Sequence, residues 1–349
     1  MIKNGSTYII GEIGQNHNGS VDIAKLIVDL VSRPIKEESF GLDLKPIDAV
    51  KLTKRDLSEE LSVSQMNRPY NNANSFGKTY GEHRAFLELS DEEHYEIYKY
   101  AKSKGLDFVE TLCAPKCLSL LNYFSPDYLK VASRDLTNIP LLEVMAETKI
   151  PIILSTGMAG KIELDDALET ISRYHSNISI LHCVSQYPTE PDNLNLNTIL
   201  YLKEHYGNYH IGFSDHTIGI SAPAIAVGLG AEIIEKHITI DRHMKGTDQA
   251  GSLGPDGVYR MVRDIRIVER WLGVKDLYIE KSVSSAREKL ERSIATKHEM
   301  KKGDVICKED LHMLSPGNGF KWRQLNYVLG RHLNRDIPAN EIIYPKDIE

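Results

Sequence analysis

Residues 210–241 read HIGFSDHTIGISAPAIAVGLGAEIIEKHITID, and this stretch decides the fold class. Two short runs within it, HIGFSD (210–215) and AEIIEKH (231–237), have the length and composition of buried strands. The segment between them is long enough for the crossover helix that two parallel strands require. The stretch therefore predicts a parallel strand–helix–strand unit.

The same alternation extends in both directions along the chain. Helix-like segments separate the strand-like runs, and the segment that begins at Ser90 carries Glu93 three residues later, a capping-box pattern. Eight units of this kind predict an α/β fold, the (β/α)8 TIM barrel. A doubly wound open sheet is the alternative, but no glycine-rich phosphate fingerprint follows the first strand. The eight runs are residues 7–14, 48–53, 107–112, 128–133, 151–156, 178–183, 210–215 and 231–237.

Composition excludes several classes of protein. The 349 residues are 41% hydrophobic and 26% charged, with a formal net charge of −7, which is ordinary for a globular protein and predicts no nucleic-acid or membrane partner. The N-terminal sequence has no apolar run typical of a signal peptide. Four cysteines are too few for a disulfide framework in a chain of this length, so we expect a cytoplasmic protein.

The sequence pattern changes after residue 273. Residues 274–288 resemble a linker, and residues 289–349 combine short β-type runs with KKGD and PGNG turns. We therefore expect a catalytic barrel over 1–273, a linker over 274–288 and a small β-rich domain over 289–349. Residues 54–90 form a long polar insertion whose aromatic and basic residues favour a functional loop over a disordered one.

Polar residues gather at the ends of the predicted strands. In a parallel barrel these ends form the active-site face. A lone serine there is more often a turn residue, and a lone histidine is more often a satisfied core group. Polar ends on all eight strands together favour a shared pocket. The residues are Glu12, Lys51, Thr111, Lys130 with Ser133, Ser155, His182 with Ser185, Ser214 with His216, and Glu235 with His237.

The residue types at these ends indicate the ligand. An unpaired ammonium within a strand is costly, so an anionic ligand would compensate Lys51 and Lys130. Together with several hydroxyl groups, the lysines suggest a small phosphate or carboxylate ester. His216 and His237 come from consecutive strand ends and suggest a metal pair, with general acid–base catalysis as the alternative role.

Several motifs make the chain similar to the N-acetylneuraminate (sialic acid) synthase family over nearly its whole length. They occur in the family's order, and the C-terminal part resembles the antifreeze-like (SAF) domain of that family. The insertion is most similar to the animal branch. The motifs are EIGQNHNG, RPYNNANSFGKTYGEH, KVASRDLTNIPLLE, ILSTGMA, LHCVSQYPT, GFSDHTIGI, EKHITID and KGTDQAGSL.

This resemblance implies a (β/α)8 barrel that condenses phosphoenolpyruvate with an aldose, forms a 3-deoxy-2-keto sugar acid and releases phosphate. It implies a divalent metal, typically Mn²⁺ with Mg²⁺ or Co²⁺ as alternatives, bound by His216 and His237. It also implies a domain-swapped homodimer. The expected catalytic residues are Glu235, Lys51, Lys130 and His237. The expected substrate-binding residues are Lys51, Thr111, Lys130, Ser133, Ser155, Ser185, Tyr187, Ser214, Asp248, Asn18 and Asn74.

Two departures from the family pattern affect the sugar. Leu52 and Thr53 replace a Phe-Gln pair, and Ser315 stands where a basic residue usually precedes PGNG. The aldose therefore stays open among N-acetylmannosamine, its 6-phosphate, a dideoxy diacetamido sugar and a non-acetylated aldose. Two alternative hypotheses for the function are a metallohydrolase that uses Asp215 with the two histidines, and a non-enzymatic binding module on an inactive barrel.

Overall fold

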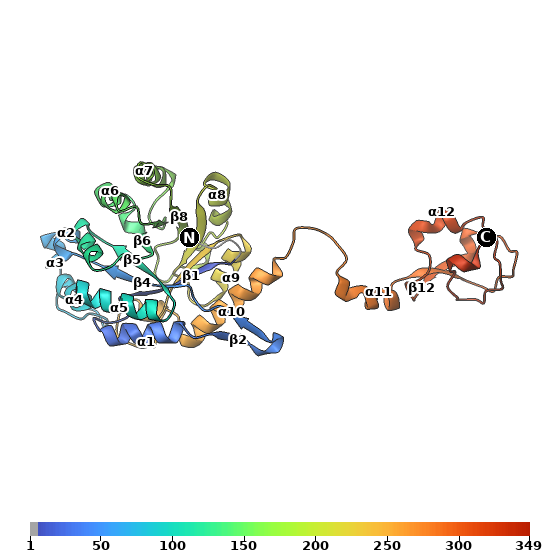
Figure 1. Cartoon of the computed structure of the whole chain (residues 1–349), viewed down its shortest axis with the longest axis horizontal. Coiled ribbons are helices and arrows are strands. Elements are labelled where there is room, and N and C mark those ends of the chain that lie inside the picture. The colour runs from blue at the N-terminus through green and yellow to red at the C-terminus, as the bar shows by residue number, and fades with distance from the viewer. Residues whose placement is uncertain (1–5) are drawn as a thin grey trace. The chain divides into compact units, whose positions relative to one another are not determined.

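Eight parallel strands close into a barrel in the first of the two units of the chain, residues 1–273 and 274–349 (Figure 1). The computed structural model describes residues 6–349, without the side chain of Phe40. The first strand, β1, pairs with both β4 and β10, and this pairing closes the sheet. The predicted TIM barrel is thus confirmed. Its strands are β1 (Tyr8–Gly14), β4 (Ala49–Lys54), β5 (Asp107–Leu112), β6 (Tyr128–Val131), β7 (Ile152–Ser155), β8 (Ile178–Cys183), β9 (His210–Asp215) and β10 (Ile233–His237).

Helices surround the barrel (Figure 1). The predicted capping box is present: Ser90 Oγ accepts a hydrogen bond from Glu93 N at 3.2 Å, and Glu93 Oε2 accepts one from Ser90 N at 2.7 Å. Such reciprocal bonds satisfy amide groups that a helix start leaves unpaired. The outer helices are α1 (Val21–Val31), α5 (Asp91–Ser103), α6 (Ile139–Glu147), α7 (Lys161–Ser172), α8 (Thr198–His205), α9 (Ser221–Gly228) and α10 (Pro255–Trp271).

Two excursions interrupt the strand–helix alternation. The insertion at 54–90 folds into the short helices α2 (Leu57–Glu60), α3 (Val63–Met66) and α4 (Tyr80–Leu87). An antiparallel hairpin of β2 (Ile35–Glu37) and β3 (Leu42–Leu44) precedes β4 and was not predicted. Its strands are three residues long, too short for an alternation of apolar and polar residues to be visible.

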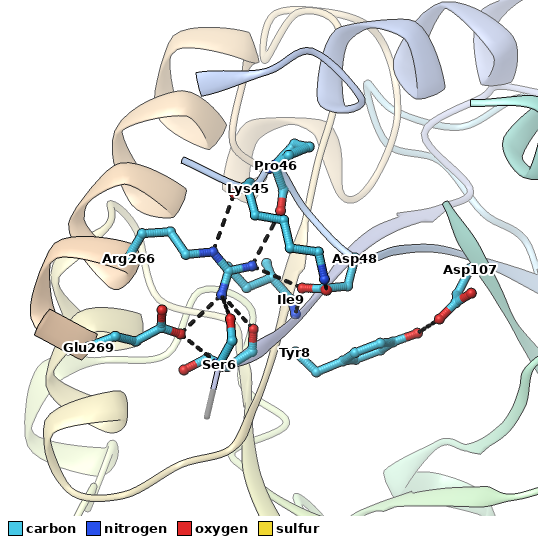
Figure 2. Close-up of polar contacts among 10 residues, drawn as sticks. Ser6, Tyr8, Ile9, Lys45, Pro46, Asp48, Asp107, Arg266 and Glu269 are labelled. Atoms are coloured by element: carbon cyan, nitrogen blue, oxygen red, sulfur yellow. Dashed lines mark hydrogen bonds and ion pairs between the residues drawn. The ribbon is translucent and has the colours of Figure 1, made fainter. Parts of the chain in front are cut away.

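Arg266 of α10 connects several segments at the amino-terminal side of the barrel through hydrogen bonds and ion pairs (Figure 2). Its side chain is 5% exposed, and the guanidinium lies 3.0 Å from both Asp48 Oδ2 and Glu269 Oε1. It also donates hydrogen bonds to Ser6 Oγ, Thr7 O, Lys45 O and Pro46 O. One side chain therefore joins the last barrel helix to the start of β1 and to the segment before β4.

The second unit is small and β-rich. It contains α11 (Ser284–Leu290), the antiparallel pair β11 (Ser293–Thr296) and β12 (Leu311–Leu314), and α12 (Leu325–Val328). Its own core includes Ile294, Phe320 and Ile337. All four cysteines of the chain are free. Among the described residues, no helix is both long and apolar enough to cross a membrane.

Candidate active site

A ring of eight buried polar side chains, one from each barrel strand, forms the floor of a cavity of about 470 Å³. These side chains are at most 5% exposed. We call them the polar ring. Its members are Glu12, Lys51, Thr111, Lys130, Ser155, Cys183, Ser214 and Glu235.

The twofold period of a β-strand explains the polar ring. Each member follows by two residues a residue of the layer below, so it points to the same side of the barrel wall. Seven of those preceding residues form one apolar cluster, and the eighth is Gly212. The cluster also includes Tyr8, and the seven are Ile10, Ala49, Val109, Tyr128, Ile153, Leu181 and Ile233. The ring therefore lies on a packed apolar plug, toward the carboxyl ends of the strands.

Carboxylates already compensate both lysines of the polar ring. Lys51 Nζ forms an ion pair with Glu12 and lies 3.8 Å from Glu235 Oε2, while Lys130 Nζ lies 3.7 Å from Glu235 Oε1. Lys51 Nζ also donates to Thr111 Oγ1 at 3.1 Å. The expectation that these ammonium groups depend on a ligand for compensation is therefore corrected, because Glu12 and Glu235 balance their charge.

Burial and pairing shift the pKa values of the four charged ring members in different directions. Burial raises the pKa of Glu12 to about 7, although Lys51 opposes this shift. For Glu235, burial acts in the same direction, but Lys130 and Lys51 prevail and lower its pKa to about 2. Burial lowers the pKa of Lys130, whereas Glu12 and Glu235 overcome burial and raise the pKa of Lys51. Glu235 is accordingly ionised at neutral pH.

Donor groups converge beside Lys130. Lys130 Nζ donates to Ser155 Oγ at 2.6 Å, and Gly157 N donates to Ser133 Oγ at 2.9 Å. A Cβ atom on Gly157 would lie only 2.4 Å from Ser185 Oγ and 2.9 Å from Ser133 Oγ. This part of the cavity therefore brings two serine hydroxyls close to the backbone, and a larger residue at 157 would displace them.

His216 and His237 lie together above the polar ring, with ring centroids 5.7 Å apart. Burial and the neighbouring His237 lower the pKa of His216 to about 4, and burial also lowers the pKa of His237. Both imidazoles are therefore neutral, the form that binds a metal. Tyr187 packs against His216 at a centroid distance of 4.0 Å.

These two histidines fit a divalent metal. His216 Nδ1 is hydrogen-bonded to Val184 O at 2.9 Å, so Nε2 keeps its lone pair for a ligand. His237 Nδ1 is buried and has no hydrogen-bond partner among the described residues. No cluster of three or more His, Cys, Asp or Glu side chains suited to a metal occurs in residues 6–349. The protein would thus supply two nitrogen ligands and leave the other positions to substrate and water.

Three arginines also line the cavity. Arg55 and Arg134 both pair with Glu60, at 2.5 and 3.2 Å. Arg84 donates to Tyr80 Oη at 2.8 Å and has no ion-pair partner among the described residues. Because Arg55, Tyr80 and Arg84 belong to the insertion or its boundary, residues 54–90 form part of the cavity wall.

The structure brings together twelve of the fourteen predicted site residues. Asn18 and Asn74 do not line the cavity: Asn18 Nδ2 donates to Lys245 O at 2.9 Å, and Asn74 Oδ1 accepts from Gly246 N at 3.5 Å. They contact the segment before Asp248 instead. The candidate site residues that line the cavity are Lys51, Thr111, Lys130, Ser133, Ser155, Ser185, Tyr187, Ser214, His216, Glu235, His237 and Asp248.

Some residues lie in other places than the sequence predicted. His182 points away from the cavity, with Nε2 2.8 Å from Leu194 O, and Cys183 lines it instead. Glu12, which the sequence placed among the polar strand ends without a specific role, lies in the cavity, and so do the arginines, which were not predicted. Counting by twos from Leu181 and Ile10 would have placed Cys183 and Glu12 inside. Nothing in the local pattern could have placed the arginines.

Comparison with known proteins identifies relatives over almost the whole chain. The sequence model of the NeuB family matches residues 45–276, and that of the SAF domain matches residues 291–349. An N,N'-diacetyllegionaminic acid synthase of Legionella pneumophila is 33% identical over 98% of this chain and 94% of its own length. A human N-acetylneuraminate-9-phosphate synthase is 33% identical over 87% of this chain and 82% of its own length.

A solved structure has the same architecture. The N-acetylneuraminic acid (sialic acid) synthetase of Leptospira borgpetersenii, crystallised with citrate, superposes with a TM-score of 0.67. Its sequence is 29% identical, and the match covers 81% of this chain and 90% of that one.

Proposed function

The chain belongs to the NeuB family, and we propose that it condenses phosphoenolpyruvate with N-acetylmannosamine or a related amino sugar. The products are a 3-deoxy-2-keto sugar acid (a nonulosonate) and phosphate. NeuB-family synthases are transferases that join phosphoenolpyruvate to a sugar. The observation that supports this reaction best is the polar ring, which combines two lysines, an ionised Glu235 and hydroxyl groups below two neutral histidines.

The phosphoenolpyruvate would bind over Lys51 and Lys130. Lys130 and Ser155 are hydrogen-bonded at 2.6 Å, and Lys51 and Thr111 at 3.1 Å, so each ammonium is held in place before the ligand arrives. The serines around Gly157 would donate hydrogen bonds to phosphate oxygens. Preorganised donors of this kind stabilise the negative charge that grows on phosphate as it leaves.

Glu235 would act at the carbon that becomes positive. After the enol carbon attacks the aldehyde, positive charge develops at C2 of the former phosphoenolpyruvate. Glu235 stays ionised beside Lys51 and Lys130, and Ser214 Oγ donates to its Oε1 at 2.9 Å. The carboxylate would stabilise the positive charge and orient the water that adds to C2. Loss of phosphate from the resulting tetrahedral intermediate then gives the keto acid.

The metal site would be His216 and His237, with Mn²⁺ as the ion we propose. A bound divalent cation polarises the aldehyde of the open-chain sugar. Tyr187 and Asp248 also line the cavity and would contact the sugar. Asn18 and Asn74 would act indirectly, by holding residues 245–249.

The departures from the family pattern bear on the aldose. Thr53 lines the cavity, whereas Leu52 is fully buried and does not. In the second unit, Ser315 Oγ donates to Leu290 O at 2.9 Å. A threonine offers a shorter side chain than a glutamine, so the sugar pocket has a different donor set at this point. A different, non-acetylated aldose is therefore the second candidate.

Location and assembly belong to the same proposal. We place the enzyme in the cytoplasm, and four free cysteines agree with a reducing compartment. We also propose a homodimer in which the SAF domain of one subunit covers the barrel of its partner. Residues 1–273, 274–288 and 289–349 would then be catalytic barrel, linker and covering domain.

Phosphate release tests the proposed function. Phosphoenolpyruvate and Mn²⁺ are supplied with a panel of amino sugars, their 6-phosphates and non-acetylated aldoses, with and without chelator. Release that needs both metal and one particular aldose is the expected result, and it names the substrate. Release without any aldose would indicate a hydrolase, and binding of phosphoenolpyruvate without turnover on any sugar would indicate an inactive barrel.

A further inference from the structure

Asp215 and Lys236 form an ion pair on the outer side of the barrel wall. Lys236 Nζ lies 2.6 Å from Asp215 Oδ2, and the two side chains are 1% and 0% exposed. Because successive residues of a strand point to opposite faces, this pair points away from the cavity while Ser214 and Glu235 point into it. Neither Asp215 nor Lys236 lines the cavity.

This pair holds the backbone around His216. Asp215 Oδ1 accepts a hydrogen bond from Thr217 N at 2.7 Å, and Lys236 Nζ donates one to Thr217 O. The residues before and after His216 are thus bound to the same ammonium group. The imidazole itself is fixed from the other side by Val184 O.

The same pair also reaches the second histidine. Lys236 directly precedes His237, and it is paired with Asp215 in the register of β9 and β10. A single ion pair therefore spans the two strand ends that carry the imidazoles. A change in this pair would move the two histidines relative to each other.

Stability alone does not account for an ion pair buried at this depth. Desolvation of two charges is expensive, and hydrophobic residues of similar volume often stabilise a protein as well or better. We propose that Asp215 and Lys236 are positioning residues that set the spacing of His216 and His237, and thereby the affinity of the site for a divalent cation. This inference rests on the proposed function, which assigns the two histidines to the metal.

Metal affinity measured apart from turnover tests the inference. In the double variant Asp215→Leu/Lys236→Met, both charges are absent and no unpaired charge remains. We expect the Kd for Mn²⁺, measured by electron paramagnetic resonance, to rise about 10- to 100-fold, as for other outer partners of metal ligands. The Kd for phosphoenolpyruvate without metal, measured by calorimetry, should stay within about twofold because the polar ring is untouched.

A control variant and a milder substitution accompany the double variant. Lys102 lies between Asp107 and Asp127 at the opposite ends of the strands, so Lys102→Met repeats the lysine-to-methionine change far from the histidines and should leave Mn²⁺ affinity unchanged. Asp215→Asn keeps the shape and the acceptor for Thr217 N. It should weaken Mn²⁺ binding and alter the visible spectrum of bound Co²⁺, which reports ligand geometry.

The possible failures are distinguishable. Unchanged Mn²⁺ affinity and an unchanged Co²⁺ spectrum in either folded pair variant would overturn the positioning role, provided that His216→Ala and His237→Ala lose Mn²⁺. If those histidine variants bind Mn²⁺ like the wild type, this inference falls together with the metal assignment. Absence of phosphate release by the wild type with every aldose would instead refute the proposed reaction, while the Mn²⁺ measurements would still decide the positioning role.

Discussion

Replacement of Arg266 by methionine should destabilise the barrel by about 3 kcal/mol. The guanidinium is 5% exposed and pairs with Asp48, whose side chain is 6% exposed (Figure 2). Removal of one partner from a buried ion pair typically costs about 3–5 kcal/mol, because the other charge is left uncompensated. Asp48 would keep its ion pair with the exposed Lys45 and its bond from Ile9 N at 2.9 Å, so we take the lower end of that range.

Lost hydrogen bonds contribute in the same direction. Arg266 donates to Thr7 O at 2.7 Å and to Pro46 O at 3.3 Å, and neither carbonyl gains a new donor in the variant. A buried acceptor without a partner typically costs about 1–3 kcal/mol. These values do not add, because all the bonds share one side chain. Methionine retains part of the aliphatic packing, which limits the loss to the polar contacts.

Urea unfolding followed by far-ultraviolet circular dichroism measures this change, because the long helices belong to residues 1–273. Arg263→Met is the matched control: Arg263 lies on the same helix, is one-third exposed and, among residues 6–349, forms its ion pair with Asp264 alone, so less than about 0.5 kcal/mol is expected. Arg266→Met/Asp48→Asn should recover part of the loss. A loss below about 1 kcal/mol for Arg266→Met would refute the reasoning.

Three further substitutions test the site and its surroundings. Gly157→Ala should raise KM for phosphoenolpyruvate at least about tenfold, because the new methyl group would lie 2.4 Å from Ser185 Oγ. Lys130→Met should lower kcat about 100-fold or more without unfolding the barrel, because it removes a donor from the leaving phosphate. Glu88→Gln should flatten the dependence of stability on pH. Burial raises the pKa of Glu88 to about 7 against the effect of Arg55. The contribution of Glu88 to wild-type stability is therefore complete below about pH 4.5 and is lost as the pH rises to about 7, a loss of at most about 3 kcal/mol.

Two measurements check these expectations. Steady-state kinetics of phosphate release should show an unchanged KM in Gly160→Ala, a nearby control, and a tenfold or smaller loss of kcat in Lys130→Met would contradict its role. Urea unfolding at pH 5 and pH 8 should separate wild type from Glu88→Gln. Equal losses of stability between these pH values in both proteins would show that Glu88 does not titrate as described.

The period of two along a strand accounts for what the sequence predicted well. Seven of the eight polar ring members were already visible as strand-end residues, because each strand is a short apolar run that ends in a polar residue. The error at His182 arose where two neighbouring residues were both plausible. Cys183 is two residues after the inward-pointing Leu181 and therefore also points into the barrel. His182 points outward and stacks on Phe213 outside the cavity.

Long-range pairing accounts for what the sequence could not show. The ion pairs of Lys51 with Glu12, and of Arg134 with Glu60, join residues far apart in the chain. No local pattern specifies them, because each depends on which strand ends become neighbours when the barrel closes. The hairpin at 35–44 was missed for a different reason, since its strands are shorter than the window that a periodicity needs.

The binding sites proposed for the two substrates differ in how well the sequence predicts them. Four of the groups assigned to phosphoenolpyruvate lie on strands, where burial and the alternation of side chains fix their direction: Lys51, Thr111, Lys130 and Ser155. Tyr187 and Asp248, which are assigned to the sugar, lie on loops after β8 and β10, and the insertion adds Tyr80 and Arg84 to the cavity wall. Their positions depend on packing between segments that share no sequence periodicity. The polar ring can therefore be predicted from the sequence, whereas the aldose must be found by experiment. A substitution on the insertion should therefore alter sugar preference more than phosphoenolpyruvate binding.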